Sequence, residues 1–243
     1  MRSLPEAIAA FLRPRGAELR CHAALQRMRR RHDGTWQLTL PDGTITADHV
    51  ISALPAAALA RALPPEAQPL ARELSLIPAV TVAVVNLQYR GVTLPVTGFG
   101  HLVPSSEDEA LLGIVYDSVA FPQHDGSGTP SVRLTVMLGG AWFSRAFGDP
   151  PSAAPIAAVE QRAQRAVLEH LGLTVNPQRC IVTVQEACIP QYTLGHWERM
   201  ERIGRFLEEQ RMPLSLIGAS YSGVSVNDCI ASAKAAVGRL LGG

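Results

Sequence analysis

The N-terminal part of the chain changes from a helical to a strand pattern of apolar and polar residues. Apolar residues recur every three or four positions over residues 4–12, and a Pro-Arg-Gly stop follows, which predicts a packed helix. Residues 18–25 predict a short strand. Two further strand patterns, 35–40 and 44–54, flank the Pro41-Asp42-Gly43 turn and predict a β-hairpin. The end of the second arm is almost wholly apolar, which predicts a strand buried on both faces.

The middle of the chain carries a long series of strand patterns. Two helical patterns precede it, and Pro64-Pro65 separates them near residue 64. From residue 79 to residue 138 the alternation has the period of strands, and turn-rich pieces separate the runs. We expect mostly antiparallel pairing among these strands, which cover 79–90, 98–105, 111–120 and 132–140.

The C-terminal part returns to mixed helices and strands. An amphipathic helix is expected over 155–171, ending at Gly172. It is followed by a strand over 180–187, a loop, and a helix from about 197 to 211. A short buried strand then leads into a glycine turn and a final alanine-rich helix.

Composition restricts the classes of function. The 243 residues are 47% apolar with a formal net charge of +1, which indicates a globular protein with a substantial core and no affinity for nucleic acid. The arginine-rich stretch 27–31 is short and typical of a solvated strand or turn. The four cysteines lack C-x-x-C spacing, so we expect reduced thiols and no metal site. The longest apolar stretch, 77–87, is too short to span a membrane.

The turn before the last helix is the strongest candidate for chemistry. Gly218 and Gly223 bracket it, and the helix that follows presents unpaired N–H groups and the positive end of its dipole. Such an end favours anions. Val224 and Ser225 stand where a P-loop has Lys and Ser or Thr, which argues against nucleoside triphosphate hydrolysis. A purely structural glycine turn is the alternative.

Five stretches carry a resemblance to a known family. The sequence resembles the protoporphyrinogen oxidase family of the flavin amine oxidase superfamily over essentially its whole length. The stretches are "ADHVISALP" (47–55), "GFGHLVPSSED" (98–108), "LGIVYDSVAFP" (112–122), "IPQYTLGHW" (189–197) and "GASYSGVSVNDCI" (218–230). The resemblance implies a mixed α/β fold, a partial FAD-dependent oxidoreductase. Residues 1–77 and 192–243 are then expected in the FAD-binding domain, and residues 78–191 in a substrate-binding lobe with a mainly antiparallel sheet.

The resemblance also implies a reaction and a cofactor site. It implies oxidation of protoporphyrinogen IX to protoporphyrin IX with FAD and oxygen, in haem biosynthesis at the mitochondrial inner membrane. The stretch Val224, Ser225 and Val226 is expected to contact FAD, with Leu25 beside the adenine and a further contact near Val184. Leu25 stands where the family usually has valine, and it is equally typical of a core residue.

For the substrate, the resemblance points to Phe99, Gly100, Leu102, Met137 and Ile189. Apolar side chains suit an apolar macrocycle, and Phe99 is expected to stack on a pyrrole. The same alternating apolar residues are typical of strand cores. No nucleophile or acid–base set is expected: His101 and His196 are interpreted as structural hydrogen-bonding groups, and Asp117 and Asp228 as turn or cap residues.

Features that the family carries upstream have no match in this sequence. These are the G-x-G-x-x-G turn for the FAD pyrophosphate, a membrane-associated segment, and an arginine for a substrate propionate. The sequence is therefore interpreted as a fragment or short form, and we expect an exposed edge on its sheet. The resemblance implies membrane attachment through other segments, and a homodimer is a possible assembly. Two alternatives stay open: another member of the superfamily, such as an amine oxidase or carotenoid desaturase, and a non-catalytic product that acts through protein contacts without FAD.

Overall fold

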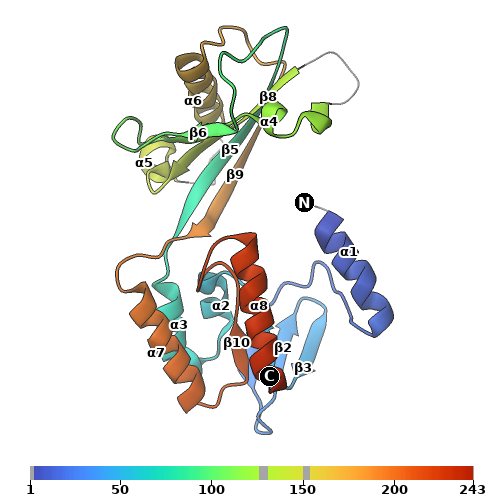
Figure 1. Cartoon of the computed structure of the whole chain (residues 1–243). Coiled ribbons are helices and arrows are strands. Elements are labelled where there is room, and N and C mark those ends of the chain that lie inside the picture. The colour runs from blue at the N-terminus through green and yellow to red at the C-terminus, as the bar shows by residue number, and fades with distance from the viewer. Residues whose placement is uncertain (1–2, 126–130, 150–153, 243) are drawn as a thin grey trace. The chain divides into compact units, whose positions relative to one another are not determined.

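Buried apolar side chains form two separate clusters, and each cluster belongs to one of two compact units. The computed structural model describes residues 3–125, 131–149 and 154–242. Unit 1 comprises Met1–Ile77 and Thr193–Gly243, and unit 2 comprises Pro78–Tyr192 (Figure 1). The expected mixed α/β fold is confirmed, since antiparallel sheets and helices occur together. That unit 1 binds FAD and unit 2 binds substrate stays a prediction.

Unit 1 contains two small sheets. Its strands are β1 (Arg27–Arg30), β2 (Trp36–Leu40), β3 (Gly43–Ala47), β4 (Val50–Ser52) and β10 (Leu214–Leu216). The first three form an antiparallel sheet in the order β1-β2-β3, and β10 pairs with β4 in parallel. The predicted hairpin is confirmed: Leu40 pairs with Gly43 across the Pro41-Asp42 turn, and Gly43 has a φ of 144°.

Two strand predictions in unit 1 are wrong. Residues 18–25 form no strand. The pairing of β1 with β2 ends at Arg27–Thr39 and at the hydrogen bond from the Gln26 amide to the Thr39 carbonyl. Because β2 turns away at Pro41, the residues before Gln26 have no strand to pair with. The second arm of the hairpin is also divided between the two sheets. Its apolar end is not buried on both faces: Ser52 is buried, whereas Ile51 is 37% exposed.

Helices surround the core of unit 1. They are α1 (Ser3–Leu12), α2 (Ala56–Ala62), α3 (Gln68–Ser75), α7 (His196–Glu209) and α8 (Val226–Leu241), with 3-10 turns at Arg13–Arg15 and Pro65–Ala67. Leu59, Leu74 and Ile203 join α2, α3 and α7 in the core, and Arg202 of α7 forms a two-bond ion pair with Glu73 of α3. The helix at α1 is confirmed, but its expected packing is wrong, because no described residue of α1 is buried.

Unit 2 is a five-stranded antiparallel sheet in the order β6-β7-β8-β5-β9. Its strands are β5 (Ala79–Arg90), β6 (Gly100–Leu102), β7 (Leu111–Val115), β8 (Ser131–Gly140) and β9 (Arg179–Pro190). Its helices are α4 (Asp117–Ala120), α5 (Phe143–Phe147) and α6 (Ala154–Leu171), with a 3-10 turn at Pro122–Asp125. The expected antiparallel pairing is confirmed. The boundaries differ: the pattern over 111–120 ends as α4, and β9 continues through part of the expected loop because its residues 189 and 190 pair with β5.

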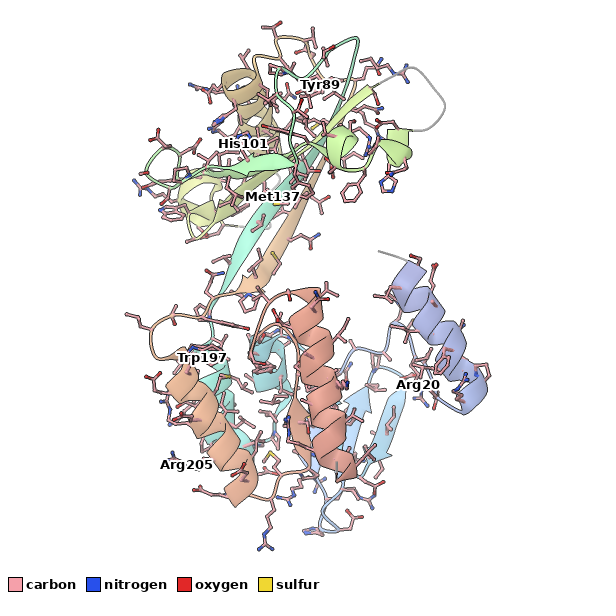
Figure 2. The ribbon with its side chains drawn as sticks, viewed as in Figure 1. Arg20, Tyr89, His101, Met137, Trp197 and Arg205 are labelled. Atoms are coloured by element: carbon pink, nitrogen blue, oxygen red, sulfur yellow. The ribbon has the colours of Figure 1, made fainter. Side chains whose placement is uncertain are left out.

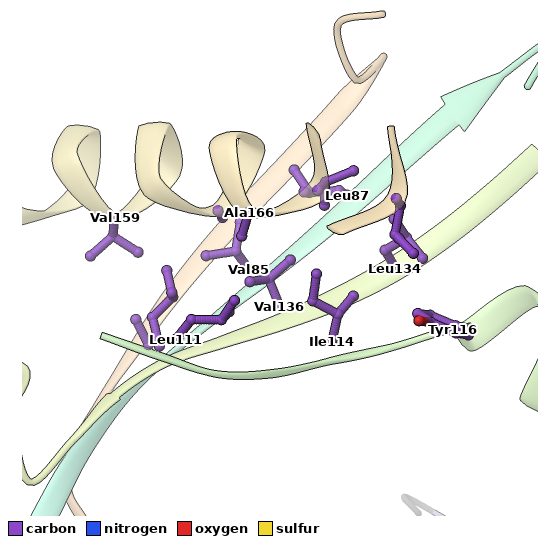
Figure 3. Packing of buried hydrophobic residues seen from close by; sticks show 14 of the residues in the cluster. Val85, Leu87, Leu111, Ile114, Tyr116, Leu134, Val136, Val159 and Ala166 are labelled. Atoms are coloured by element: carbon purple, nitrogen blue, oxygen red, sulfur yellow. The ribbon is translucent and has the colours of Figure 1, made fainter. Parts of the chain in front are cut away.

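Helix α6 covers one face of this sheet. Val159 and Ala166 of α6 pack on Val85 and Val136 of the two central strands (Figure 3). Gly172, in the left-handed conformation with a φ of 65°, follows α6 where the sequence predicted its end. Because side chains alternate along a strand, the residues between these core positions point to the opposite face of the sheet.

Candidate functional site

The face of the unit 2 sheet opposite α6 brings together residues from all five strands. Residues that are directly paired across antiparallel strands share a face. The register therefore places one row on this face: Leu102, Gly113, Met137, Val84 and Thr183. The next row consists of Gly100, Val115, Thr135, Asn86 and Ile181. Ile189, paired with Val80, lies on the same face. We call this surface the open face.

Three large apolar side chains on the open face are exposed. The exposed fractions are 87% for Leu102, 37% for Met137 and 40% for Ile189. Phe99, immediately before β6, is 67% exposed. Figure 2 shows Met137 on this sheet, together with His101 of the adjoining edge strand. Four of the five residues expected to contact substrate thus share one face, Phe99 adjoins them, and none of the apolar side chains among them is buried.

Gly100 has a structural function that the sequence did not reveal. Its φ is 156°, and a Cβ built on it would lie 2.5 Å from the Ile114 carbonyl oxygen and 3.0 Å from the Val115 Cα. The glycine therefore allows β6 to approach β7 closely. Gly113 is similar, because a Cβ there would contact the Leu102 side chain at 3.2 Å.

A hollow lined by both apolar and polar residues continues the open face along β5 and β9. Its volume is about 280 Å³, and its lining includes Asn86, Asp117, Arg179 and Ile181. The Asn86 amide donates to the Thr135 hydroxyl at 2.8 Å, and this hydroxyl donates to the Asp117 carboxylate at 2.7 Å. The sequence reasoning missed Asn86, Arg179 and Ile181. The available signal was the polar residue Asn86 inside the apolar run of β5.

The N-terminus of α8 is capped by its own side chains. The Ser225 hydroxyl accepts a hydrogen bond from the Asp228 amide at 3.0 Å, and the Asp228 carboxylate accepts one from the Ser225 amide at 3.1 Å. Two of the donors expected to be open are therefore satisfied. The amides of Val226 and Asn227 remain without an acceptor among the described residues.

The capping box also explains Gly223. Its φ is 138°, and a Cβ there would collide with the Asp228 side chain. The missing side chain at residue 223 therefore admits the capping carboxylate, whatever else approaches this helix end. Hydrogen bonds from the Ser225 hydroxyl and then from its amide lower the pKa of Asp228 below its usual value.

Replacing the cap should destabilise unit 1 modestly. For Ser225→Ala we expect a loss of about 1 kcal/mol in the free energy of unfolding, measured by urea denaturation at pH 7. Because the Asp228 pKa is lowered in the folded state, the carboxylate part of this stabilisation exists above the unfolded pKa and is lost as the pH falls through the folded one. Ser222→Ala is the control, since Ser222 is exposed and makes no hydrogen bond within the described chain. Equal unfolding of the two variants would contradict the prediction.

The remaining predicted FAD contacts, Leu25 and Val184, are partly buried against the cores of their own units. Leu25 is partly buried against the core of unit 1. Val184 belongs to unit 2, on the face covered by α6, where it packs against the core. Val184 thus has a packing role in unit 2, and its contact with FAD stays a prediction.

The two motif histidines form hydrogen bonds, as the sequence predicted. In unit 1 the buried His196 shares one with the Tyr221 carbonyl at 2.8 Å, which ties α7 to the turn before α8. In unit 2 His101 contacts Tyr116 and His170. In the described ranges there is no cluster of three or more metal-ligating side chains, and none of the described helices is long and apolar enough to span a membrane.

The whole chain is similar to enzymes of one family. It is 51% identical to bovine protoporphyrinogen oxidase, covering 100% of this chain and 50% of that protein, and 52% identical to the human one, covering 98% and 50%. The chain thus spans about half the length of the curated relatives it matches.

Solved structures show the same fold at low sequence identity. A crystal structure from Exiguobacterium sp. 255-15 superposes with a TM-score of 0.79 at 22% identity, covering 97% of this chain and 50% of that one. Reduced UDP-galactopyranose mutase has a TM-score of 0.68 at 14% identity, with 85% and 44% covered. The sequence profile of the flavin-containing amine oxidoreductases matches residues 1–241. With this match over nearly its full length, the chain belongs to the flavin-containing amine oxidoreductase family.

Proposed function

We propose that this chain supplies the substrate-holding sheet and part of the flavin site of a protoporphyrinogen oxidase. The observation that carries the proposal is the exposed apolar open face of unit 2. Leu102, Met137 and Ile189 come from three strands and share that face, although burying them would stabilise the fold. The names of the bovine and human relatives support this substrate.

The open face suits a tetrapyrrole in both shape and chemistry. A sheet surface with apolar side chains can contact the face of a macrocycle, and the exposed Phe99, immediately before the edge strand, is proposed to stack against a pyrrole. Met137 adapts to an uneven surface because its side chain is unbranched and flexible. The hollow lined by Asn86 and Arg179 provides hydrogen-bond donors beside this apolar area, as ligand sites commonly do.

We further propose that FAD is the flavin and that Val224, Ser225 and Val226 contact it, with Leu25 as a second contact. The free amides of Val226 and Asn227 and the exposed side chains of Val224 and Val226 support this assignment. FAD, when bound, accepts hydride from the substrate and passes electrons to oxygen. The α8 dipole favours negative charge at this position without a cationic side chain, although the Asp228 carboxylate already lies at the same helix end. Val184, which is partly buried against the core of unit 2, is proposed as a further contact.

The location and assembly are proposed from the motif resemblance. We propose attachment to the mitochondrial inner membrane through segments other than those described here, and a homodimer.

Substrate binding is tested by changing an open-face residue that the fold does not need. Leu102→Ser should weaken binding of protoporphyrin IX, followed by porphyrin fluorescence, because a leucine contact of about 1.5–3 kcal/mol corresponds to roughly 10-fold to 100-fold in Kd. Its stability should not change, because Leu102 is 87% exposed. Leu168→Ser is the matched control: Leu168 lies on α6, away from the open face, and is 47% exposed. Equal porphyrin affinity in both variants, or no binding by the unmodified chain, would overturn the proposal.

A further inference from the structure

Three polar side chains are linked behind the strand that carries the proposed substrate contacts. His101 alternates with Gly100 and Leu102 on β6 and therefore points to the α6 side of the sheet. Its Nδ1 lies 2.7 Å from the Tyr116 hydroxyl, and its Nε2 lies 3.2 Å from Nδ1 of His170 in the last turn of α6. The two imidazole rings stack with centroids 5.0 Å apart and an interplanar angle of 20°.

Strand β6 has few other attachments. It comprises three residues, lies at the edge of the sheet and pairs with β7. One backbone hydrogen bond to the neighbouring segment lies on each side of β6. The Tyr116 amide donates to the Phe99 carbonyl at 2.9 Å, and the Val103 amide donates to the Leu112 carbonyl at 3.0 Å. Short edge strands open easily, so the side-chain link to α6 matters for the position of β6.

The link tolerates one proton but not two. With both imidazoles neutral, the Tyr116 hydroxyl donates to His101 Nδ1, and His101 Nε2–H donates to His170 Nδ1. One added proton is accommodated: His170 Nδ1–H donates to His101 Nε2, and His101 Nδ1–H donates to the tyrosine oxygen. A second proton places N–H groups on both facing nitrogens, so the contact becomes repulsive.

Among the residues that the structure describes, no carboxylate contacts this pair. Tyr116 and His170 are the titratable groups that contact His101. The neighbouring Glu169 of α6 is held by Arg162 and Arg165, and Asp108, in the loop after β6, is held by Arg162. Burial, and then the charge of His170, lower the pKa of His101 below its usual 6.5.

We propose that His101 is a positioning residue, which together with Tyr116 and His170 clamps β6 onto α6 and releases it when both histidines are protonated. The inference rests on the proposed function, in which β6 presents Gly100 and Leu102 to a tetrapyrrole. The clamp acts from the face opposite to the substrate. Because the His101 pKa is lowered in the folded state, the clamped state is destabilised as the pH falls from 6.5 through that lowered pKa.

Amide hydrogen exchange of the chain tests the clamp without any ligand. We expect the protection factors of the Val103 and Tyr116 amides to fall about tenfold between pH 7.5 and pH 5, because release of β6 exposes both amides to exchange. In His170→Gln they should stay within about twofold, because a neutral amide accepts from His101 Nε2–H whether or not His101 carries its extra proton. Tyr116→Phe should lower both protection factors at every pH. Amides of β5 and β8 serve as the internal reference for a folded unit.

A control variant and two contradicting outcomes complete the exchange experiment. His32→Gln should keep the full drop, because His32 lies exposed in a turn of unit 1. A flat profile in the unmodified chain, or an unchanged drop in His170→Gln, would overturn the clamp. Protoporphyrin IX affinity at pH 5 should rise relative to the unmodified chain in His170→Gln, and an equal affinity would count against positioning. The exchange result does not depend on porphyrin binding, so the clamp and the proposed function can fail separately.

Discussion

Gly100→Ala should detach the edge strand β6 and destabilise unit 2 by about 2–4 kcal/mol. The new Cβ would lie 2.5 Å from the Ile114 carbonyl oxygen, and the φ of 156° is strained for any L side chain. Both neighbours are backbone atoms of β7, so no rotamer change relieves the collision. Denaturant unfolding measures the loss, and exchange at the Val103 amide localises it.

A neighbouring glycine provides the control for this substitution. A Cβ at Gly98 would meet one atom, Tyr116 Cε2, at 4.0 Å, which is ordinary contact. Gly98→Ala should therefore leave unfolding within about 0.5 kcal/mol of the unmodified chain. If Gly100→Ala were equally neutral, β6 would not depend on its close approach to β7. If Gly100→Ala lowered porphyrin affinity but left stability unchanged, Gly100 would serve only to leave room for the substrate.

Leu138→Ala should destabilise unit 2 by about 2–5 kcal/mol, the range for truncating a buried leucine. Leu138 is fully buried in the core beneath α6. The loss combines the transfer free energy of the removed atoms with the cavity that remains. Thermal or denaturant unfolding followed by circular dichroism gives the change in the free energy of unfolding.

The adjacent residue should behave in the opposite manner. Met137 points to the open face and is 37% exposed, so Met137→Ala should cost less than about 1 kcal/mol of stability while weakening protoporphyrin IX binding several-fold. A large stability loss for Met137→Ala with unchanged porphyrin affinity would place Met137 in a core instead. Neighbouring residues of one strand thus separate folding from binding.

Long periodic segments were predictable because their patterns are local. The strand β5, the helices α2 and α6, and the hairpin between β2 and β3 lie close to their expected positions, each with turn or stop residues at its ends. The predictions that failed depended on partners. Residues 18–25 alternate like a strand but have no strand to pair with, and Ile51 belongs to an apolar run but lies on an uncovered side of a two-stranded sheet.

The candidate site also combines features that local motifs predicted with features that depend on tertiary contacts. The motif around residue 218 predicted a glycine turn before a helix, but it did not reveal that the Asp228 carboxylate occupies the space beside Gly223. Leu102 and Ile189 were singled out by resemblance. Their common face depends on the pairing register and on irregularities at Val80/Val82 and Leu111/Gly113.

By itself, the sequence determined the helices and strands with strong periodicity, the mixed α/β class and the motifs that mark the family. These follow from residues within a few positions of one another, where backbone geometry sets which side chains share a side. Only the tertiary structure decided that Leu102, Met137 and Ile189 share an exposed face and that His101 meets His170. These residues are tens of positions apart in the sequence. Strand register and helix packing bring them together, and no local pattern specifies either.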